Sequence, residues 1–195
     1  MDNGSEKRIE FVEKIIKKVQ GLSPEEIAEK TKAIEERLFD FANFLESPTA
    51  LLYVPRNFEV DTTDIIKRSL NTKKSIVLPS VNTDKQINSM FKITNLDSNM
   101  MASNNGLRVP DPAKCKSVGL DDINIAIIPG ICFDEKGGRV GTGDKYYNKF
   151  IPKLSPTIRK IALCFEEQLV TQVPSEFRNK NLDIIITDKR IVYKI

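Results

Sequence analysis

Short, almost unbroken apolar runs recur along the chain after Ser47-Pro48, and they constrain its fold more than any other feature. Runs this short and this rich in Ile, Leu and Val are typical of strands that are covered on both faces. The predicted strands are Ala50 to Val54, Ser75 to Leu78, Met90 to Ile93, Ile123 to Ile128, Ile161 to Phe165 and Ile184 to Ile186.

Helical signals lie between several of these runs. Thr62 or Thr63 is suited to cap a short helix that continues through Leu70, and another helix is expected to begin near Asp144 and run toward Pro152. Alternation of strands and helices favours a mainly parallel sheet with helices on both sides. The predicted fold class is therefore α/β, a three-layer α/β/α arrangement with a Rossmann-like sheet.

The first 46 residues have the spacing of helices rather than strands. A break at Gly21 is followed by Ser23-Pro24-Glu25-Glu26, in which Ser23 and Glu26 can cap each other as a capping box. At 195 residues the chain is expected to form one domain, residues 1–195, with helices of residues 1–46 packed on the α/β core. The apolar stripe of the second helix should face that core and comprises Ile27, Thr31, Ile34, Leu38, Phe41 and Leu45.

The composition excludes several kinds of chemistry. The chain contains no histidine, which removes Ser-His-Asp and Cys-His catalysis and histidine-ligated metals. Its three cysteines, Cys115, Cys132 and Cys164, are widely spaced and never form a C-x-x-C pair, so neither a disulfide framework nor a structural zinc site is predicted. Carboxylates, Lys, Arg, Tyr, backbone amides or a bound metal must do any chemistry.

Charge and hydropathy indicate which kinds of binding partner the chain can have. The net charge of +3 arises from 30 basic and 27 acidic residues that are scattered along the chain, so a nucleic-acid-binding face is not expected. The acidic N-terminal start argues against a targeting peptide, and no apolar stretch is long enough to span a membrane. We expect a cytoplasmic monomer whose partners are small molecules.

The sharpest local signal is a cluster of glycines directly after the most apolar strand. Five of the nine glycines lie between Gly130 and Gly143. A strand that leads through such a loop into a helix offers backbone N–H groups to an anion. The spacing is neither that of a Walker A loop nor that of a dinucleotide fingerprint. The alternative is that Asp134 to Gly138 form a plain hairpin turn, for which these residues are well suited.

The same stretch resembles the signature of the 5-formyltetrahydrofolate cyclo-ligases, also called methenyltetrahydrofolate synthetases. The resemblance covers nearly the whole chain in the family's order and rough spacing. Its motifs are Phe58 to Thr62, Pro110-Asp111-Pro112, Pro129 to Asp134, Gly138 to Gly143, Tyr146-Tyr147, Cys164 to Gln168 and Asp183 to Asp188.

The resemblance implies an ATP- and magnesium-dependent cyclisation of 5-formyltetrahydrofolate to 5,10-methenyltetrahydrofolate, with release of ADP and phosphate. Transfer of the γ-phosphoryl group to the formyl oxygen would activate the formyl carbon for attack by nitrogen 10. Such a transfer depends mostly on alignment and charge neutralisation, which need no histidine. The alternative is a divergent member of the family that binds folate or nucleotide without turnover.

The resemblance also assigns residues. Arg139, Lys145 and Tyr146 would be catalytic, and Val54, Glu59 and Tyr146 would contact the folate. Without the family, Tyr146 or Tyr147 would simply pack in the core, and Glu59 and Arg8 would be solvated surface residues. The implied ATP-binding residues are Arg8, Arg139, Val140, Gly141, Thr142, Gly143, Asp144, Lys145, Tyr146 and Tyr147.

The chain departs from the family's pattern at the expected magnesium ligands. Asn148 and Asn179 stand where the family usually has acidic residues, and an amide oxygen brings no negative charge to a hard cation. A weak magnesium site at Asn148 and Asn179 is therefore predicted. Three further departures are Val12, Ser80 and Lys145, which replace two basic residues and a glycine.

Overall fold

The computed structural model describes residues 3–81, 88–103, 106–142, 146–175, 179–180 and 182–194. Among these residues, the largest sheet has eight strands in the order β14-β13-β10-β7-β1-β2-β3-β6. From one edge to the other the strands are β14 (Ile191–Tyr193), β13 (Ile184–Thr187), β10 (Arg159–Cys164), β7 (Ile125–Ile127), β1 (Thr49–Leu51), β2 (Ser75–Val81), β3 (Asn88–Ile93) and β6 (Lys116–Val118).

The five central strands of this sheet are parallel, and the strands toward both edges are antiparallel. Strands β7 and β13 are buried along their whole length, as expected for strands covered on both faces. Each of the six predicted strands is present, with ends that differ by a few residues. The prediction of a mainly parallel sheet is confirmed.

The N-terminal helices follow the sequence pattern closely. They are α1 (Asn3–Gln20), α2 (Pro24–Asp40) and α3 (Ala42–Glu46), and the predicted capping box is present between Ser23 and Glu26. The predicted stripe is buried at Ile34, Leu38 and Phe41, but Leu45 is 54% exposed. This part of the prediction is wrong because the chain leaves the helical conformation at Phe41, so that Phe44 takes the buried position in α3.

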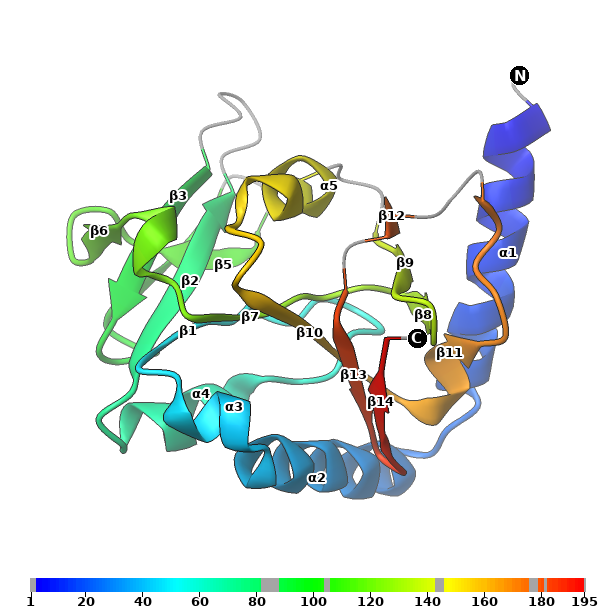
Figure 1. The fold of residues 1–195 in the computed structure, drawn as a ribbon, viewed down its shortest axis with the longest axis horizontal. Helices are drawn as coiled ribbons and strands as arrows, with labels where there is room; N and C mark the ends of the chain where they lie inside the picture. The colour runs from blue at the N-terminus through cyan, green and yellow to red at the C-terminus, as the bar shows by residue number, and fades with distance from the viewer. Residues whose placement is uncertain are drawn as a thin grey trace.

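Helices lie on both faces of the large sheet, which confirms the three layers (Figure 1). Helices α2, α3 and α4 (Thr63–Leu70) lie on one face, and the short helix α5 (Tyr146–Phe150) lies on the other. Single helical turns are formed by η1 (Leu120–Asp122), η2 (Ile151–Lys153) and η3 (Glu166–Gln168). No helix of the described residues is long and apolar enough to cross a bilayer.

Two smaller sheets complete the described fold. One has the order β11-β8-β9-β12 and the other pairs β4 with β5. Figure 1 shows the first of them beside α1, at one end of the large sheet. Their strands are β4 (Met100–Ala102), β5 (Arg108–Pro110), β8 (Cys132–Asp134), β9 (Gly138–Val140), β11 (Leu169–Val170) and β12 (Asn179–Lys180).

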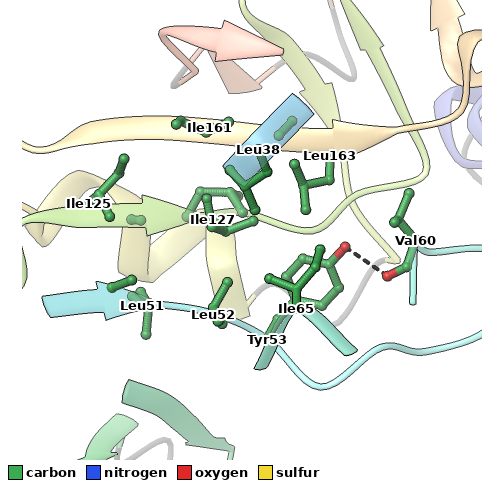
Figure 2. Packing of buried hydrophobic residues seen from close by; sticks show 14 of the residues in the cluster. Leu38, Leu51, Leu52, Tyr53, Val60, Ile65, Ile125, Ile127, Ile161 and Leu163 are labelled. Atoms are coloured by element: carbon green, nitrogen blue, oxygen red, sulfur yellow. Dashed lines mark hydrogen bonds between the residues drawn. The ribbon is translucent and has the colours of Figure 1, made fainter. Parts of the chain in front are cut away.

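The main core packs the parallel strands against α2 and α4, as Figure 2 shows. Leu51, Ile127 and Ile161 come from three neighbouring strands, and Leu38 reaches them from α2. The core also fixes the start of the loop after β1. The buried Tyr53 hydroxyl donates a hydrogen bond to the Val60 carbonyl oxygen at 3.0 Å.

The order of the parallel strands determines where a ligand site is expected. Numbered by chain order, the five parallel strands run 2-1-3-4-5 across the sheet, which is the flavodoxin-like order of a doubly wound fold. The order reverses between β1 and β7. In such folds the ligand crevice lies beyond the carboxyl ends of the strands on either side of this switch point.

Candidate functional site

A cavity of about 350 Å³ lies beyond the carboxyl ends of β1 and β7, where the strand order predicts a ligand site. We call it the switch-point cavity. Four residues assigned from the sequence line it: Val54, Glu59, Thr142 and Tyr147. The rest of the lining was missed and comprises Pro55, Arg56, Thr63, Ile66, Pro79, Leu96, Met100, Gly106, Leu107, Arg108, Val109 and Pro129.

Glu59 both stabilises the loop after β1 and lines the switch-point cavity. Its carboxylate accepts a hydrogen bond from the Arg56 backbone N–H at 3.0 Å, and its own N–H donates to the Arg56 carbonyl oxygen at 3.1 Å. The side chain also lines the switch-point cavity. The sequence offered a loop carboxylate or a ligand contact, and the geometry is compatible with both.

The first half of the glycine window is a hairpin. Strands β8 and β9 are antiparallel, and the Gly137 N–H donates to the Asp134 carbonyl oxygen at 2.9 Å. Asp134 also accepts from the Lys136 and Gly138 N–H groups at 3.0 and 2.8 Å. Gly137 has φ +75°, which favours glycine. The turn interpretation is confirmed for residues 134–138, whose N–H groups from Lys136 to Gly138 bond Asp134, and anion binding by the later glycines stays a prediction.

Arg139 follows the turn of this hairpin and is a buried residue with 2% exposure. Its Nε donates to the Pro129 carbonyl oxygen at 2.6 Å, and its Nη1 donates to the Asn148 Oδ1 at 3.1 Å. The guanidinium carbon lies 5.5 Å from the centre of the Tyr147 ring, within range of a cation–π interaction. Arg139 therefore joins the end of β7 to helix α5.

Arg8 connects helix α1 to the segment that follows β9 through a hydrogen bond. Its guanidinium donates to the Gly141 carbonyl oxygen at 2.8 Å, although the two residues are 133 positions apart. This contact joins two of the residues that the family resemblance assigned to ATP. The interpretation of Arg8 as a solvated surface residue is wrong, because the side chain is partly buried in this contact.

A second cavity of about 420 Å³ adjoins the first on the side of α1, and we call it the α1 cavity. Val12 and Ile16 of α1 form one wall, and Asn57, Phe58 and Ile131 are also part of its lining. The two cavities share four lining residues, so they lie side by side. The shared residues are Pro55, Arg56, Leu107 and Thr142.

Tyr146 and Tyr147 lie differently with respect to the cavities. Their rings meet edge to face with centroids 4.8 Å apart, and Tyr146 stacks on Phe150 at 5.7 Å. Both tyrosines are buried in the main core, and of the two only Tyr147 lines the switch-point cavity. Burial, more than the neighbouring Tyr146 and Glu59, raises the pKa of Tyr147 well above its usual range. Its hydroxyl therefore stays protonated at neutral pH.

The remaining assigned residues lie away from the cavities or outside the described residues. Val140 is buried in a second apolar cluster with Ile15 of α1 and does not line either cavity. Gly143, Asp144 and Lys145 lie outside the described residues, so their expected roles stay predictions. The backbone of Asn179 pairs with that of Arg139, and the structure does not describe its side chain.

The described residues do not fit a magnesium ion held by the protein alone. The Asn148 Oδ1 accepts a hydrogen bond from a guanidinium group, which a cation would repel. The described part of the chain contains no group of three or more acidic or cysteine side chains able to hold a metal. The cysteines are free, and burial raises the pKa of Cys132 to about 12, so this thiol is no nucleophile.

The strand order and the cavity at its reversal place the chain among the doubly wound α/β proteins, whose small-molecule sites lie at the switch point. Within that class, the chain belongs to the 5-formyltetrahydrofolate cyclo-ligase family, whose profile matches residues 4–188. The resemblance noted from the sequence motifs is confirmed.

Individual relatives agree with this assignment. The chain is 27% identical over 177 residues to the probable 5-formyltetrahydrofolate cyclo-ligase of Caenorhabditis elegans, an alignment that covers 85% of this chain and 84% of the relative. Its fold is similar to that of Aquifex aeolicus 5,10-methenyltetrahydrofolate synthetase, with a TM-score of 0.83 and 23% identity over 95% and 91% of the two chains. The fold is also similar to that of a 5,10-methenyltetrahydrofolate synthetase from Mycoplasma pneumoniae, with a TM-score of 0.68 and 20% identity over 91% of this chain and 96% of the other.

Proposed function

We propose that this protein catalyses the ATP-dependent cyclisation of 5-formyltetrahydrofolate to 5,10-methenyltetrahydrofolate, with release of ADP and phosphate. Family membership supports the reaction class. The observation that carries the proposal is the pair of adjoining cavities at the switch point, because this reaction needs two bound substrates in contact.

The two cavities differ in a way that suggests which substrate each one takes. The switch-point cavity holds Val54 and Glu59, and a carboxylate is a suitable acceptor for the N–H donors of a pterin ring. Of the two cavities only the α1 cavity is lined by helix α1, from which Arg8 reaches Gly141, and Arg56 lines both. Arginine suits the phosphates of a nucleotide because its planar fork matches their oxygens. We assign the pterin to the first cavity and ATP to the second.

The reaction then follows from alignment and charge. The γ-phosphoryl group moves from ATP to the formyl oxygen, which breaks the bond to ADP and makes the formyl carbon electrophilic. Nitrogen 10 attacks this carbon, loses its proton, and phosphate departs with the former formyl oxygen. Arg139 and the amides near Gly141 and Thr142 would neutralise negative charge on the moving phosphoryl group.

Magnesium enters this scheme as part of the substrate, MgATP. Phosphate oxygens are among the ligands that this cation prefers, and they supply the charge that Asn148 lacks. The expected roles of Lys145 and Tyr146 in catalysis stay part of the proposal. The monomeric state and the cytoplasmic location stay predictions.

The test is to mix the purified protein with 5-formyltetrahydrofolate and MgATP and to follow the absorbance of the methenyl product. We expect turnover that requires ATP, and an Arg139→Gln variant that folds but turns over at least about tenfold more slowly, since a charged hydrogen bond is lost. An exposed control, Lys136→Gln, should behave as wild type. Folate binding by calorimetry without any absorbance change would favour the non-catalytic alternative.

A further inference from the structure

One loop forms part of both cavities. We call residues 54–59 the shared wall. Val54 and Glu59 line the switch-point cavity, and Asn57 and Phe58 line the α1 cavity. The two residues between them, Pro55 and Arg56, line both cavities. A change in the shape of this loop would therefore alter both cavities at once.

The shared wall contains a strained residue. Phe58 has φ +69°, a left-handed conformation that costs an ordinary side chain energy and that glycine adopts freely. The Phe58 ring packs partly against the apolar cluster that contains Ile15 and Ile131. The chain persists in such a conformation only where its surroundings hold it.

Gln168, which is distant in sequence, holds the backbone of Phe58 in place by a hydrogen bond. Its side chain is 1% exposed, and its Nε2 donates to the carbonyl oxygens of Phe58 at 2.8 Å and Ile131 at 3.0 Å. Its Oε1 accepts from the Phe165 N–H at 2.9 Å. One carboxamide thus ties three segments: the shared wall, the residue before β8 and the turn after β10.

We propose that Gln168 is a positioning residue that fixes the shared wall in the conformation both substrates require. This inference rests on the proposed function, because it concerns the same two cavities. Gln168 does not line either cavity, so it acts through Phe58 and the neighbouring Glu59. A carboxamide suits the task because it donates twice and accepts once within one small group.

The first experiment replaces Gln168 by Leu, which fills similar space without hydrogen bonds, and by Glu, whose carboxylate would face two carbonyl oxygens. We expect the KM for 5-formyltetrahydrofolate and for ATP each to rise up to about tenfold, as one or two lost hydrogen bonds would give. The matched control is Thr187→Val. Thr187 is also buried, and its Oγ1 donates to Glu166 and accepts from the Lys189 N–H, but it lines neither cavity.

Thr187→Val should lower the unfolding temperature without raising either KM. If Gln168→Leu lowers the unfolding temperature by a similar amount and leaves both KM values at the wild-type level, Gln168 is merely structural and the proposal fails. A rise in only one KM also overturns it, because the shared wall would then not serve both cavities.

The second experiment tests the strain at Phe58 directly. Phe58→Gly and Phe58→Ala both lose the ring, but only glycine adopts φ +69° without cost. Added to Gln168→Leu, the Gly substitution should give lower KM values than the Ala substitution, by a few fold. Equal KM values in the two double variants would refute the role of Phe58. The same pair on the wild-type background keeps the test available if Gln168→Leu does not fold.

Failure of the proposed function can be told apart from failure of this inference. A wild-type protein that neither turns over nor binds the substrates overturns the function. The shared wall is then tested by amide hydrogen exchange, in which Gln168→Leu should speed the exchange of residues 54–59 relative to Thr187→Val. Unchanged exchange in those residues overturns the positioning role of Gln168.

Discussion

Gly141→Ala gives a direct test of how Arg139 is held. A Cβ atom at this position would lie 2.7 Å from the Arg139 Nη2 and 3.1 Å from its Nη1. To regain a contact of 3.4 Å, the guanidinium must move by about 0.7 Å. The end of an arginine side chain usually moves at little cost. Here it is buried and bonded to Pro129 and Asn148, so the displacement costs hydrogen bonds.

The size of the effect follows from those bonds. If the guanidinium moves away from Asn148 by that amount, the 3.1 Å bond between them is stretched beyond the range of a hydrogen bond. Loss of a bond that involves a charged group destabilises the folded state by about 1.5–3 kcal/mol. If the same guanidinium neutralises the ATP phosphates, the dissociation constant for ATP should rise about ten- to hundredfold.

Denaturant unfolding measures the loss of folding stability, and calorimetric titration with MgATP measures the dissociation constant for ATP. Gly119→Ala is a matched control, since a Cβ there would lie 3.4 Å from the Asp122 carboxylate, an ordinary contact. That variant should unfold within about 0.5 kcal/mol of wild type. Wild-type stability and ATP affinity in Gly141→Ala would refute the account, because they would show that the guanidinium is not fixed or does not face the nucleotide.

Two further predictions concern other groups. Asn148→Asp should leave the magnesium requirement of turnover unchanged, because the new carboxylate would pair with Arg139; a lower requirement in a magnesium titration would instead assign residue 148 to the metal. Lys30→Met should lower the free energy of unfolding by about 1.5–3 kcal/mol at pH 7, and exposed Lys32→Met should not, because Lys30 bonds Glu167 and Asp188 at 3.0 and 2.9 Å. Burial would raise the pKa of Asp188, but hydrogen bonds from Lys30 and the Glu166 N–H outweigh it and lower that pKa. The difference in the free energy of unfolding between variant and wild type is therefore full from pH about 4 to neutral pH and should shrink as the pH falls through the lower pKa of folded Asp188. An unfolding series that shows no such decrease at acid pH would contradict this account.

The central sheet was predictable from the sequence because its signal is local. Strands covered on both faces must be apolar throughout, so the apolar runs that include Leu51, Ile127 and Ile161 are enough to predict these strands. The capping box at Ser23 is equally local, since both partners lie within one turn. Leu45 was misassigned because helical periodicity was extended past Phe41, where the backbone changes direction without a glycine or proline to mark the change.

The site was only partly predictable, for a physical reason that Gln168 and Arg108 illustrate. Arg108 lines the switch-point cavity from a short edge strand whose sequence carries no periodic signal. The contacts of Gln168 span 110 and 37 residues, and spacing along the chain cannot indicate such distances. Arg8 was found through the family resemblance, although its bond to Gly141 is just as remote in sequence.

The arrangement of the two cavities bears directly on the proposed chemistry. Phosphoryl transfer between bound substrates requires the reacting atoms to lie about 3–3.5 Å apart, so the two sites must open into each other. Thr142, which lines both cavities, marks where they meet, and the buried Arg139 lies three residues before it. Since the loop after β1 forms the shared wall and the chain after β7 supplies Arg139 and Thr142, the reversal of strand order brings these two segments together. Under the proposed function, the formyl oxygen and the γ-phosphate would meet beside Thr142, and the shape of residues 54–59 would set the distance between them.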